Sequence, residues 1–260
     1  MTSTVRIERR TAAPDVAELV IDAPPLNLFT LPVVDDLAAA LAELPGDARA
    51  VLLRAEGKVF SAGVDVHDFQ GRDAEAGGEL GAAFLALTHA LEALPVPTLA
   101  VVHGLCLTIG LEVVLGCDLL WAAQEASFGL VEATVGLTPG AGGTQRLVAR
   151  AGVARATEAV LTGATYRAEV FEHWGVVNRV LAREELLPAA RDYAARLAAG
   201  PTAAAAQGKR LLRLARDGGV AAADAQTREA FGAVFGTDDI DIGITSLLEH
   251  GPGKAIFTGR

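Results

Sequence analysis

The sequence predicts an α/β body followed by a helical C-terminal segment, and three observations support that fold class. Strand-like and helix-like patterns alternate through the first part of the chain, whereas the last part shows only helical patterns interrupted by glycines. Of the 260 residues, 51% are hydrophobic and only 5% are aromatic, so we expect an aliphatic core rich in alanine. We place the boundary between the two parts at 1–197 and 198–260.

Short apolar runs predict strands in the body at 17–21, 50–53, 59–62, 99–102 and 119–122. A helix is expected after Thr30, an N-cap residue with Pro32 in the first turn, because apolar residues then recur at helical spacing. Further helices are expected around 84–94, at 110–116, and from near 144, after the glycine-rich turn 138–144. In the C-terminal segment, glycines separate the three predicted helices 201–216, 220–235 and 238–249.

Composition excludes several classes of function. With 22 Lys and Arg against 32 Asp and Glu, the net charge is −10, which disfavours binding to nucleic acid. The two cysteines form no disulfide framework, and neither they nor the five histidines have the spacing of metal ligands. The sequence shows no secretory signal pattern and no apolar stretch long enough to span a bilayer. We expect a soluble cytoplasmic protein without a metal and without a membrane partner.

Common catalytic motifs are absent. The turn at 138–144 lacks the glycine and lysine spacing of a phosphate-binding loop, and Gln145 stands where a dinucleotide fingerprint needs its third glycine. Ser61 does not lie in the G-x-S-x-G turn of a serine hydrolase. Nucleotide hydrolysis, dinucleotide redox chemistry and serine hydrolysis are therefore unsupported.

Two segments share a pattern that suits oxyanion binding. V-F-S-A-G-V-D (59–65) and A-V-V-H-G-L-C-L-T-I-G-L-E (100–112) each lead from a strand into a turn of small residues. Such turns aim backbone N–H groups at one point, and two of them facing each other would stabilise a developing oxyanion. Two tight connections without a ligand would give the same spacing, so the pattern alone leaves both interpretations open.

Two carboxylates in apolar surroundings are candidate acid–base groups. Glu112 lies within L-T-I-G-L-E-V-V-L-G, and Glu132 lies between S-F-G-L-V and A-T-V-G-L. Ionisable groups embedded in apolar sequence often titrate abnormally and mark functional sites, although either glutamate could instead be a salt-bridged structural acid. Asp118, which ends a predicted helix, is expected to be structural.

Taken together, these segments resemble the crotonase superfamily, and specifically its enoyl-CoA hydratase branch. The resemblance rests on F-S-A-G-V-D (60–65), the H-G-x-x-L-x-x-G-x-E-x-x-x-x-C-D run (103–118), F-G-L-V-E (128–132) and G-L-T-P-G-A-G-G-T-Q-R-L (136–147). It extends from P-P-L-N (24–27) to F-x-T-D-D (235–239) and G-P-G-K-A-I-F (251–257). Each fragment alone is weak, but all of them in order and in register are specific.

The resemblance implies a fold, an assembly and a site. The fold would be a crotonase-like spiral of ββα units whose C-terminal helices form trimers, usually paired into hexamers. Ala62 and Ile109 fall at the two positions whose N–H groups form the oxyanion hole, and Glu112 and Glu132 fall on the two catalytic carboxylates. Residues near CoA would be Ala62, Gly63, Val64, Asp65, Ile109 and Lys254. For Lys254, a contact from a neighbouring subunit to a CoA phosphate and a solvated tail lysine remain equally open.

The chain departs from the family pattern at three places. Thr108-Ile109-Gly110 replaces a glycine-rich triplet, Val131 replaces a proline, and Asp241-Ile242-Gly243 lacks the usual Glu-Gly pair. Isoleucine does not easily adopt positive φ, and its side chain adds bulk near the thioester. We expect these differences to affect acyl-chain specificity more than the class of reaction.

The working hypothesis is reversible addition of water across the C2–C3 double bond of a 2-enoyl-CoA thioester, with no cofactor beyond the CoA of the substrate. Enoyl-CoA isomerisation, or another crotonase-type reaction on acyl-CoA, is the alternative, but an isomerase needs only one of the two carboxylates. A non-catalytic RNA-binding role is a second alternative, which the negative charge disfavours.

Overall fold

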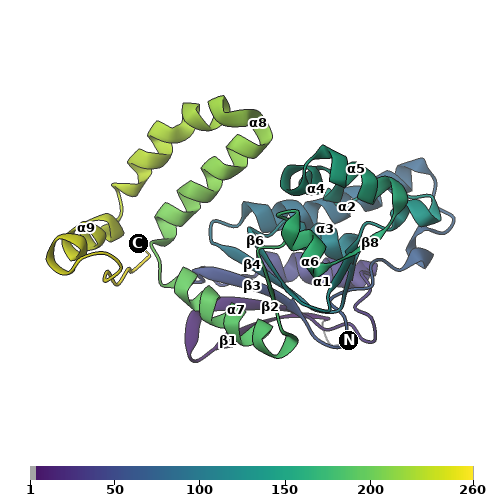
Figure 1. Ribbon diagram of the computed structural model, residues 1–260, viewed down its shortest axis with the longest axis horizontal. Coiled ribbons are helices and arrows are strands. Elements are labelled where there is room, and N and C mark those ends of the chain that lie inside the picture. The colour runs from purple at the N-terminus through teal and green to yellow at the C-terminus, as the bar shows by residue number, and fades with distance from the viewer. Residues whose placement is uncertain (1–3, 260) are drawn as a thin grey trace.

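A computed structural model describes residues 4–259, in which a six-stranded sheet forms the centre of the body (Figure 1). The strand order is β1-β2-β3-β4-β6-β9, and only the β1–β2 pair is antiparallel. These strands are β1 (Val5–Arg10), β2 (Ala13–Ile21), β3 (Ala50–Ala55), β4 (Thr98–Val102), β6 (Leu119–Ala123) and β9 (Arg179–Leu181). A second sheet contains β5 (Leu105–Leu107), β7 (Ser127–Gly129) and β8 (Thr165–Arg167).

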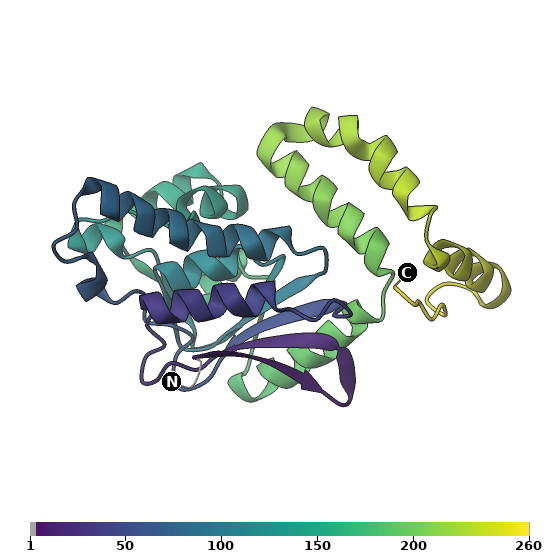
Figure 2. The same ribbon diagram turned by 180° about the vertical axis from the view of Figure 1, so that it is seen from behind.

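Helices cover both faces of the large sheet. On one face lie α1 (Leu31–Ala42), α2 (Ala74–Ala93) and α3 (Ile109–Leu115), and on the other lies α7 (Arg183–Ala198), as Figures 1 and 2 show. The body also contains the short 3-10 helices η1 (Val66–Phe69) and η2 (Glu132–Val135) and the helices α4 (Gly143–Ala151), α5 (Val153–Thr162) and α6 (Ala168–His173).

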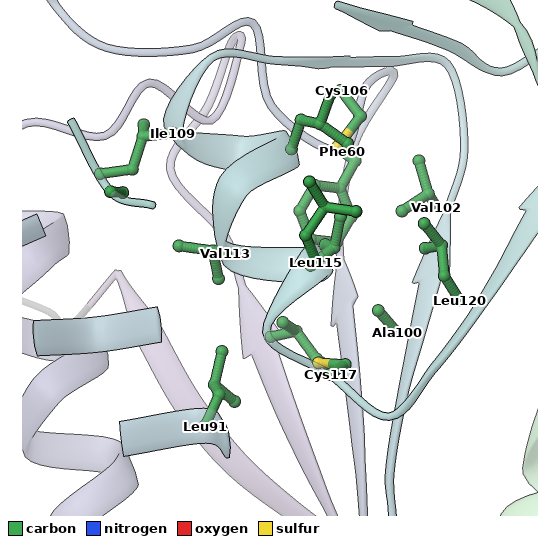
Figure 3. Packing of buried hydrophobic residues seen from close by; sticks show 14 of the residues in the cluster. Phe60, Leu91, Ala100, Val102, Cys106, Ile109, Val113, Leu115, Cys117 and Leu120 are labelled. Atoms are coloured by element: carbon green, nitrogen blue, oxygen red, sulfur yellow. The ribbon is translucent and has the colours of Figure 1, made fainter. Parts of the chain in front are cut away.

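The core consists of two aliphatic layers because side chains alternate along each buried strand. Leu53, Ala100 and Leu120 belong to the layer beneath α3, whereas Leu52 and Leu99 belong to the layer beneath α7. Figure 3 shows how the α3 layer packs, with the labelled side chains Phe60, Leu91, Ala100, Val102, Cys106, Ile109, Val113, Leu115, Cys117 and Leu120. This packing fixes α3, which carries one of the candidate catalytic residues.

One buried carboxylate on the α7 side is structural. Glu18 of β2 is 1% exposed, and it forms ion pairs with Arg54 of β3 at 2.8 Å and with Arg191 of α7 at 2.8 Å. Because both partners are cationic, the pKa of Glu18 is lowered despite its burial. Through Glu18, these ion pairs connect α7 to strands β2 and β3 of the sheet.

The structure confirms most of the strands predicted in the body and corrects one. The strands predicted at 17–21, 50–53, 99–102 and 119–122 are present, whereas 59–62 forms only an isolated bridge, between Ser61 and Cys106. The extended run stops there because Gly63 turns the chain at φ 107°. The edge strand β1 was not predicted, since its charged residues mask the alternating pattern.

The C-terminal segment contains α8 (Thr202–Val234) and α9 (Asp238–His250). The two predicted helices 201–216 and 220–235 are the arms of α8, which bends at Gly219 (φ 78°, ψ 174°) and projects from the body (Figure 2). Arg49 ties this segment to the body by donating to Gly200 O, Thr202 Oγ1 and Phe257 O. The separation into two domains stays a prediction. Among residues 4–259, no helix is long and apolar enough to cross a membrane.

Candidate active site

The two oxyanion-type turns predicted from the sequence lie in direct contact. The segment that ends at Ser61 runs beside β5, so that the Ser61 N–H donates to Leu105 O and the Leu107 N–H donates to Ser61 O, both at 3.0 Å. A Cβ added to Gly63 would lie 2.4 Å from Thr108 Oγ1, and one added to Gly110 would lie 2.7 Å from Ser61 Cβ. The parallel pairing of the two segments and the absence of side chains at Gly63 and Gly110 therefore allow the turns to come into contact.

Within the first turn, the free N–H belongs to Val64 rather than Ala62. The Ala62 N–H donates to Leu26 O at 3.0 Å, because the segment around Leu26 and Phe29 runs beside the turn. The N–H groups of Val64 and Ile109 have no acceptor within residues 4–259. We therefore correct the assignment of the first candidate donor from Ala62 to Val64 and retain Ile109.

The strained residue of the second turn is Thr108, not Ile109. Thr108 adopts φ 47° and ψ −125°, a conformation that suits glycine, whereas Ile109 begins α3 with ordinary helical geometry. Ile109 is 2% exposed and packs in the core (Figure 3), and as the first helical residue its N–H lacks an intrahelical acceptor. The Thr108 hydroxyl is buried and has no partner among the described residues.

We expect Thr108→Gly to raise the thermal stability of the protein. The change relieves backbone strain that costs about 1–3 kcal/mol, and it removes a buried hydroxyl that has no hydrogen bond. Together these gains exceed the entropic cost of ordering a glycine, which is about 1 kcal/mol. Calorimetry should show a melting temperature higher by a few degrees. Thr88 is the matched control: its buried hydroxyl also has no partner among the described residues, but Thr88 lies within α2. Thr88→Gly should lower the melting temperature, and a fall in both variants would contradict the strain argument.

Glu112 is buried on α3 and is held by backbone donors. Its side chain is 2% exposed, and Oε1 accepts from the Ala141 N–H at 2.9 Å and the Gly143 N–H at 2.8 Å. Burial raises the pKa of Glu112 to about 7, against the opposing effect of these hydrogen bonds and of the positive charge on Arg146. A Cβ at Gly143 would lie 2.5 Å from Glu112 Cγ, so only glycine fits at this position.

Glu132 is the second carboxyl of the site. It begins η2 just after β7, is 6% exposed, and its Oε2 has no hydrogen-bond partner among the described residues. The pKa of Glu132 is raised to about 7, mainly by burial and also by the charge of Glu112, against the opposing effect of a backbone hydrogen bond. The two carboxyls therefore interact electrostatically. The structure thus brings together two buried carboxyls, both with raised pKa values.

The remaining predicted site residues lie in different surroundings. Asp65 is the N-cap of η1, and its side chain accepts from the His67 N–H at 3.0 Å. Lys254 is exposed on the segment that follows α9. This segment runs back to the beginning of α8, where Phe257 O accepts from Arg49 (Figures 1 and 2). Asp118 accepts hydrogen bonds from the Thr98 N–H and hydroxyl and from Lys209, and this confirms its structural role.

The residues around Glu112 have no role that the sequence alone predicts. The backbone of the glycine-rich turn between η2 and α4 holds Glu112, and Arg146 on α4 donates to a carbonyl of that turn. The feature of the sequence that could have identified these residues is the run G-A-G-G-T-Q-R. Its closely spaced glycines indicate a backbone that must pass close to another group. That this group is Glu112 follows only from the three-dimensional structure.

The fold and the paired carboxyls agree with the crotonase superfamily that the sequence resembles, and comparison with known proteins shows the family. A model of the enoyl-CoA hydratase/isomerase family matches residues 11–259, and the chain belongs to that family. It is 32% identical over 226 residues to a probable enoyl-CoA hydratase of Mycobacterium tuberculosis, covering 86% of this chain and 87% of the relative. It is 31% identical to the 2,3-dehydroadipyl-CoA hydratase of Escherichia coli, with 86% of each chain covered.

Solved structures show the same fold. The enoyl-CoA hydratase from Bacillus anthracis superposes with a TM-score of 0.91 at 27% identity, covering 99% of this chain and all of that one (100%). The crotonase-like architecture with a helical C-terminal segment, which the resemblance implied, is therefore confirmed.

Proposed function

We propose that this protein is an enoyl-CoA hydratase that adds water reversibly across the C2–C3 double bond of a 2-enoyl-CoA thioester. The observation that carries the proposal is the pair of buried, interacting carboxyls, Glu112 and Glu132, within a family that acts on acyl-CoA thioesters. Addition of water needs one group to take a proton from water and another to supply a proton to carbon. No metal or redox cofactor enters this chemistry, and CoA is part of the substrate.

The thioester oxygen is proposed to bind between the two turns. Attack at C3 moves negative charge onto this oxygen, giving an enolate-like transition state. The free N–H groups of Val64 and Ile109 are suited to donate to it, and the N-terminus of α3 adds a partial positive charge. Because the turns pack directly on each other, these donors need little reorganisation during the reaction.

The hydrogen bonds support different roles for the two glutamates. Glu112 accepts two backbone hydrogen bonds, which favour its ionised form, so we assign it as the base that takes a proton from water. The Oε2 atom of Glu132 accepts none, which favours the protonated form, so we assign it as the acid that protonates C2. The two groups exchange roles in dehydration.

The direct test is turnover of two isomeric substrate types. A hydratase should consume crotonyl-CoA, a 2-enoyl thioester, with loss of the ultraviolet absorbance of the conjugated enoyl group. An isomerase should instead convert a 3-enoyl-CoA to the 2-enoyl form and raise that absorbance. Absence of any reaction with both substrates would favour a binding protein.

The activity should depend on pH as a bell-shaped curve centred near pH 7, because both carboxyl pKa values are raised to about 7. The site works with one carboxyl ionised and the other protonated. Below the maximum the base becomes protonated, and above it the acid loses its proton, so kcat falls on both sides. A profile of kcat against pH checks this. Activity rising steadily through alkaline pH would exclude the carboxylic acid as proton donor.

We also propose that α8 and α9 assemble with neighbouring copies into a trimer or hexamer. The segment that contains these helices exposes large apolar side chains that one chain leaves uncovered, namely Leu212, Val220, Phe231, Phe235, Ile244, Leu247 and Leu248. Contact between copies would remove this surface from water. Light scattering at micromolar concentration should report a trimer or hexamer, and a monomer would contradict the proposal.

A further inference from the structure

We propose that Arg146 is a positioning residue for Glu112 and that the C-terminal helix α8 holds it in place through Glu92. The inference rests on the proposed function, because it concerns the group assigned as the catalytic base. It follows from a continuous chain of contacts that joins α8, α2 and α4 to the turn that binds Glu112.

The first contact connects Arg146 with the backbone that holds Glu112. Arg146 Nη1 donates to Gly142 O at 3.1 Å, and Gly142 lies between Ala141 and Gly143, whose N–H groups donate to Glu112. Gly142 has φ 87°, so the turn takes a conformation that few other residues would adopt. The guanidinium thus fixes the middle carbonyl of a turn whose two outer N–H groups point at the carboxylate.

The second contact fixes the guanidinium itself. Arg146 and Glu92 of α2 are 6% and 8% exposed, and they pair through two nitrogens and both carboxylate oxygens. The Nε–Oε1 distance is 3.0 Å. A bidentate pair sets the plane of the guanidinium as well as its distance, which a single hydrogen bond does not. Burial of both partners protects the pair from solvent.

The third contact extends the chain to α8. Arg216 Nη1 lies 2.5 Å from Glu92 Oε1, and Arg213 Nη1 donates to Glu92 O. Two cationic side chains on the first arm of α8 therefore hold Glu92 together with Arg146. The helical segment takes part in organising the site in addition to its proposed role in assembly.

The charges around Glu112 explain why Arg146 matters electrostatically. The elements packed against α3 carry these ionisable groups: Glu75, Glu79, His89 and Glu92 on α2, Arg146 and Arg150 on α4, and Cys106 on β5. Glu132 on η2 interacts with Glu112 electrostatically. Glu132 and desolvation oppose ionisation of Glu112. Arg146 favours it both through its charge and through the turn it fixes, whereas Arg150 donates to Leu115 O and Cys117 O at the far end of α3.

The test compares Arg146→Met with the wild-type enzyme. Loss of the guanidinium should move the acid limb of the kcat–pH profile upward by about one pH unit, because Glu112 becomes harder to ionise. Accordingly kcat should fall about tenfold near pH 6 yet stay within about threefold of wild type at alkaline pH, with little change in KM. Arg54→Met is the matched control, since Arg54 is also 6% exposed and ion-paired but contacts Glu18 instead. It should lower stability without moving the profile.

Two further measurements keep the inference separate from the proposed function and from folding. Carbon-detected NMR titration of Glu112, assigned with Glu112→Gln, should show the same upward pKa shift in Arg146→Met even if the wild-type protein turns over no substrate. Arg146→Lys, which keeps a charge but not the bidentate geometry, should give an intermediate shift and covers the case in which Arg146→Met does not fold. A profile and a titration that coincide with wild type in both variants would overturn the inference.

Discussion

Replacing Glu112 with glutamine should lower kcat for hydration by about 10²–10⁴, the usual contribution of a positioned proton-transfer group. Glutamine retains the oxygen that accepts from the Ala141 and Gly143 N–H groups, so the turn should keep its structure while the base is lost. Binding of the CoA ester should survive, because the proposed oxyanion donors are backbone N–H groups that the mutation does not touch. The measurement is kcat and KM for crotonyl-CoA.

Glu132→Gln should cause a loss of similar size, since a hydratase needs both groups. Glu18→Gln is the control: this buried carboxylate pairs with Arg54 and Arg191 and should affect stability but not chemistry. An isomerase would behave differently, with one glutamine variant inactive and the other close to normal. Hydration within threefold of wild type in Glu112→Gln would disprove the two-carboxylate mechanism.

Removal of a single backbone N–H should distinguish the true oxyanion donors. Replacing the amide before Val64 or before Ile109 with an ester removes the N–H and leaves the side chain unchanged. Each replacement should lower kcat by about 10²–10³, the usual cost of losing one oxyanion donor. The same replacement before Ala62 should leave kcat close to wild type, because that N–H already donates to Leu26 O.

The Ala62 ester also provides the internal control for this comparison. It should lower the unfolding free energy by about 1 kcal/mol, the typical net value of a hydrogen bond. The loss at the other two positions should be smaller, because their N–H groups have no acceptor among residues 4–259. A large kcat loss at Ala62 and none at Val64 would restore the assignment made from the sequence.

Much of the fold could be predicted from the sequence because its strands are buried on both faces. The runs at 50–53 and 99–102 are apolar throughout, and the helix after Thr30 repeats its apolar residues at helical spacing. The short strands β5, β7, β8 and β9 have three residues each, which is too few for a period to be visible. Strand β1 was hidden by the charges of an exposed edge.

The candidate site shows where local patterns stop being informative. The apolar neighbours of Glu112 and Glu132 in the sequence correctly indicated buried carboxyls with shifted pKa values. The choice between Ala62 and Val64 depends on which N–H is taken up by Leu26, a residue more than thirty positions earlier in the chain. In the second turn, where Thr108-Ile109-Gly110 stands in place of a glycine-rich triplet, the residue with positive φ is Thr108, because Ile109 already belongs to α3. Both outcomes depend on tertiary packing that spacing does not encode.

The most direct test of the central claim is the fate of crotonyl-CoA in water enriched with oxygen-18. The two-carboxylate mechanism predicts a product heavier than crotonyl-CoA by one labelled water, with the label on the hydroxyl oxygen at C3 and the thioester intact in the mass spectrum. The label should appear at a rate that falls in parallel in Glu112→Gln and Glu132→Gln. Release of free CoA, or a shifted double bond without incorporated oxygen, would contradict the assignment of this protein as an enoyl-CoA hydratase.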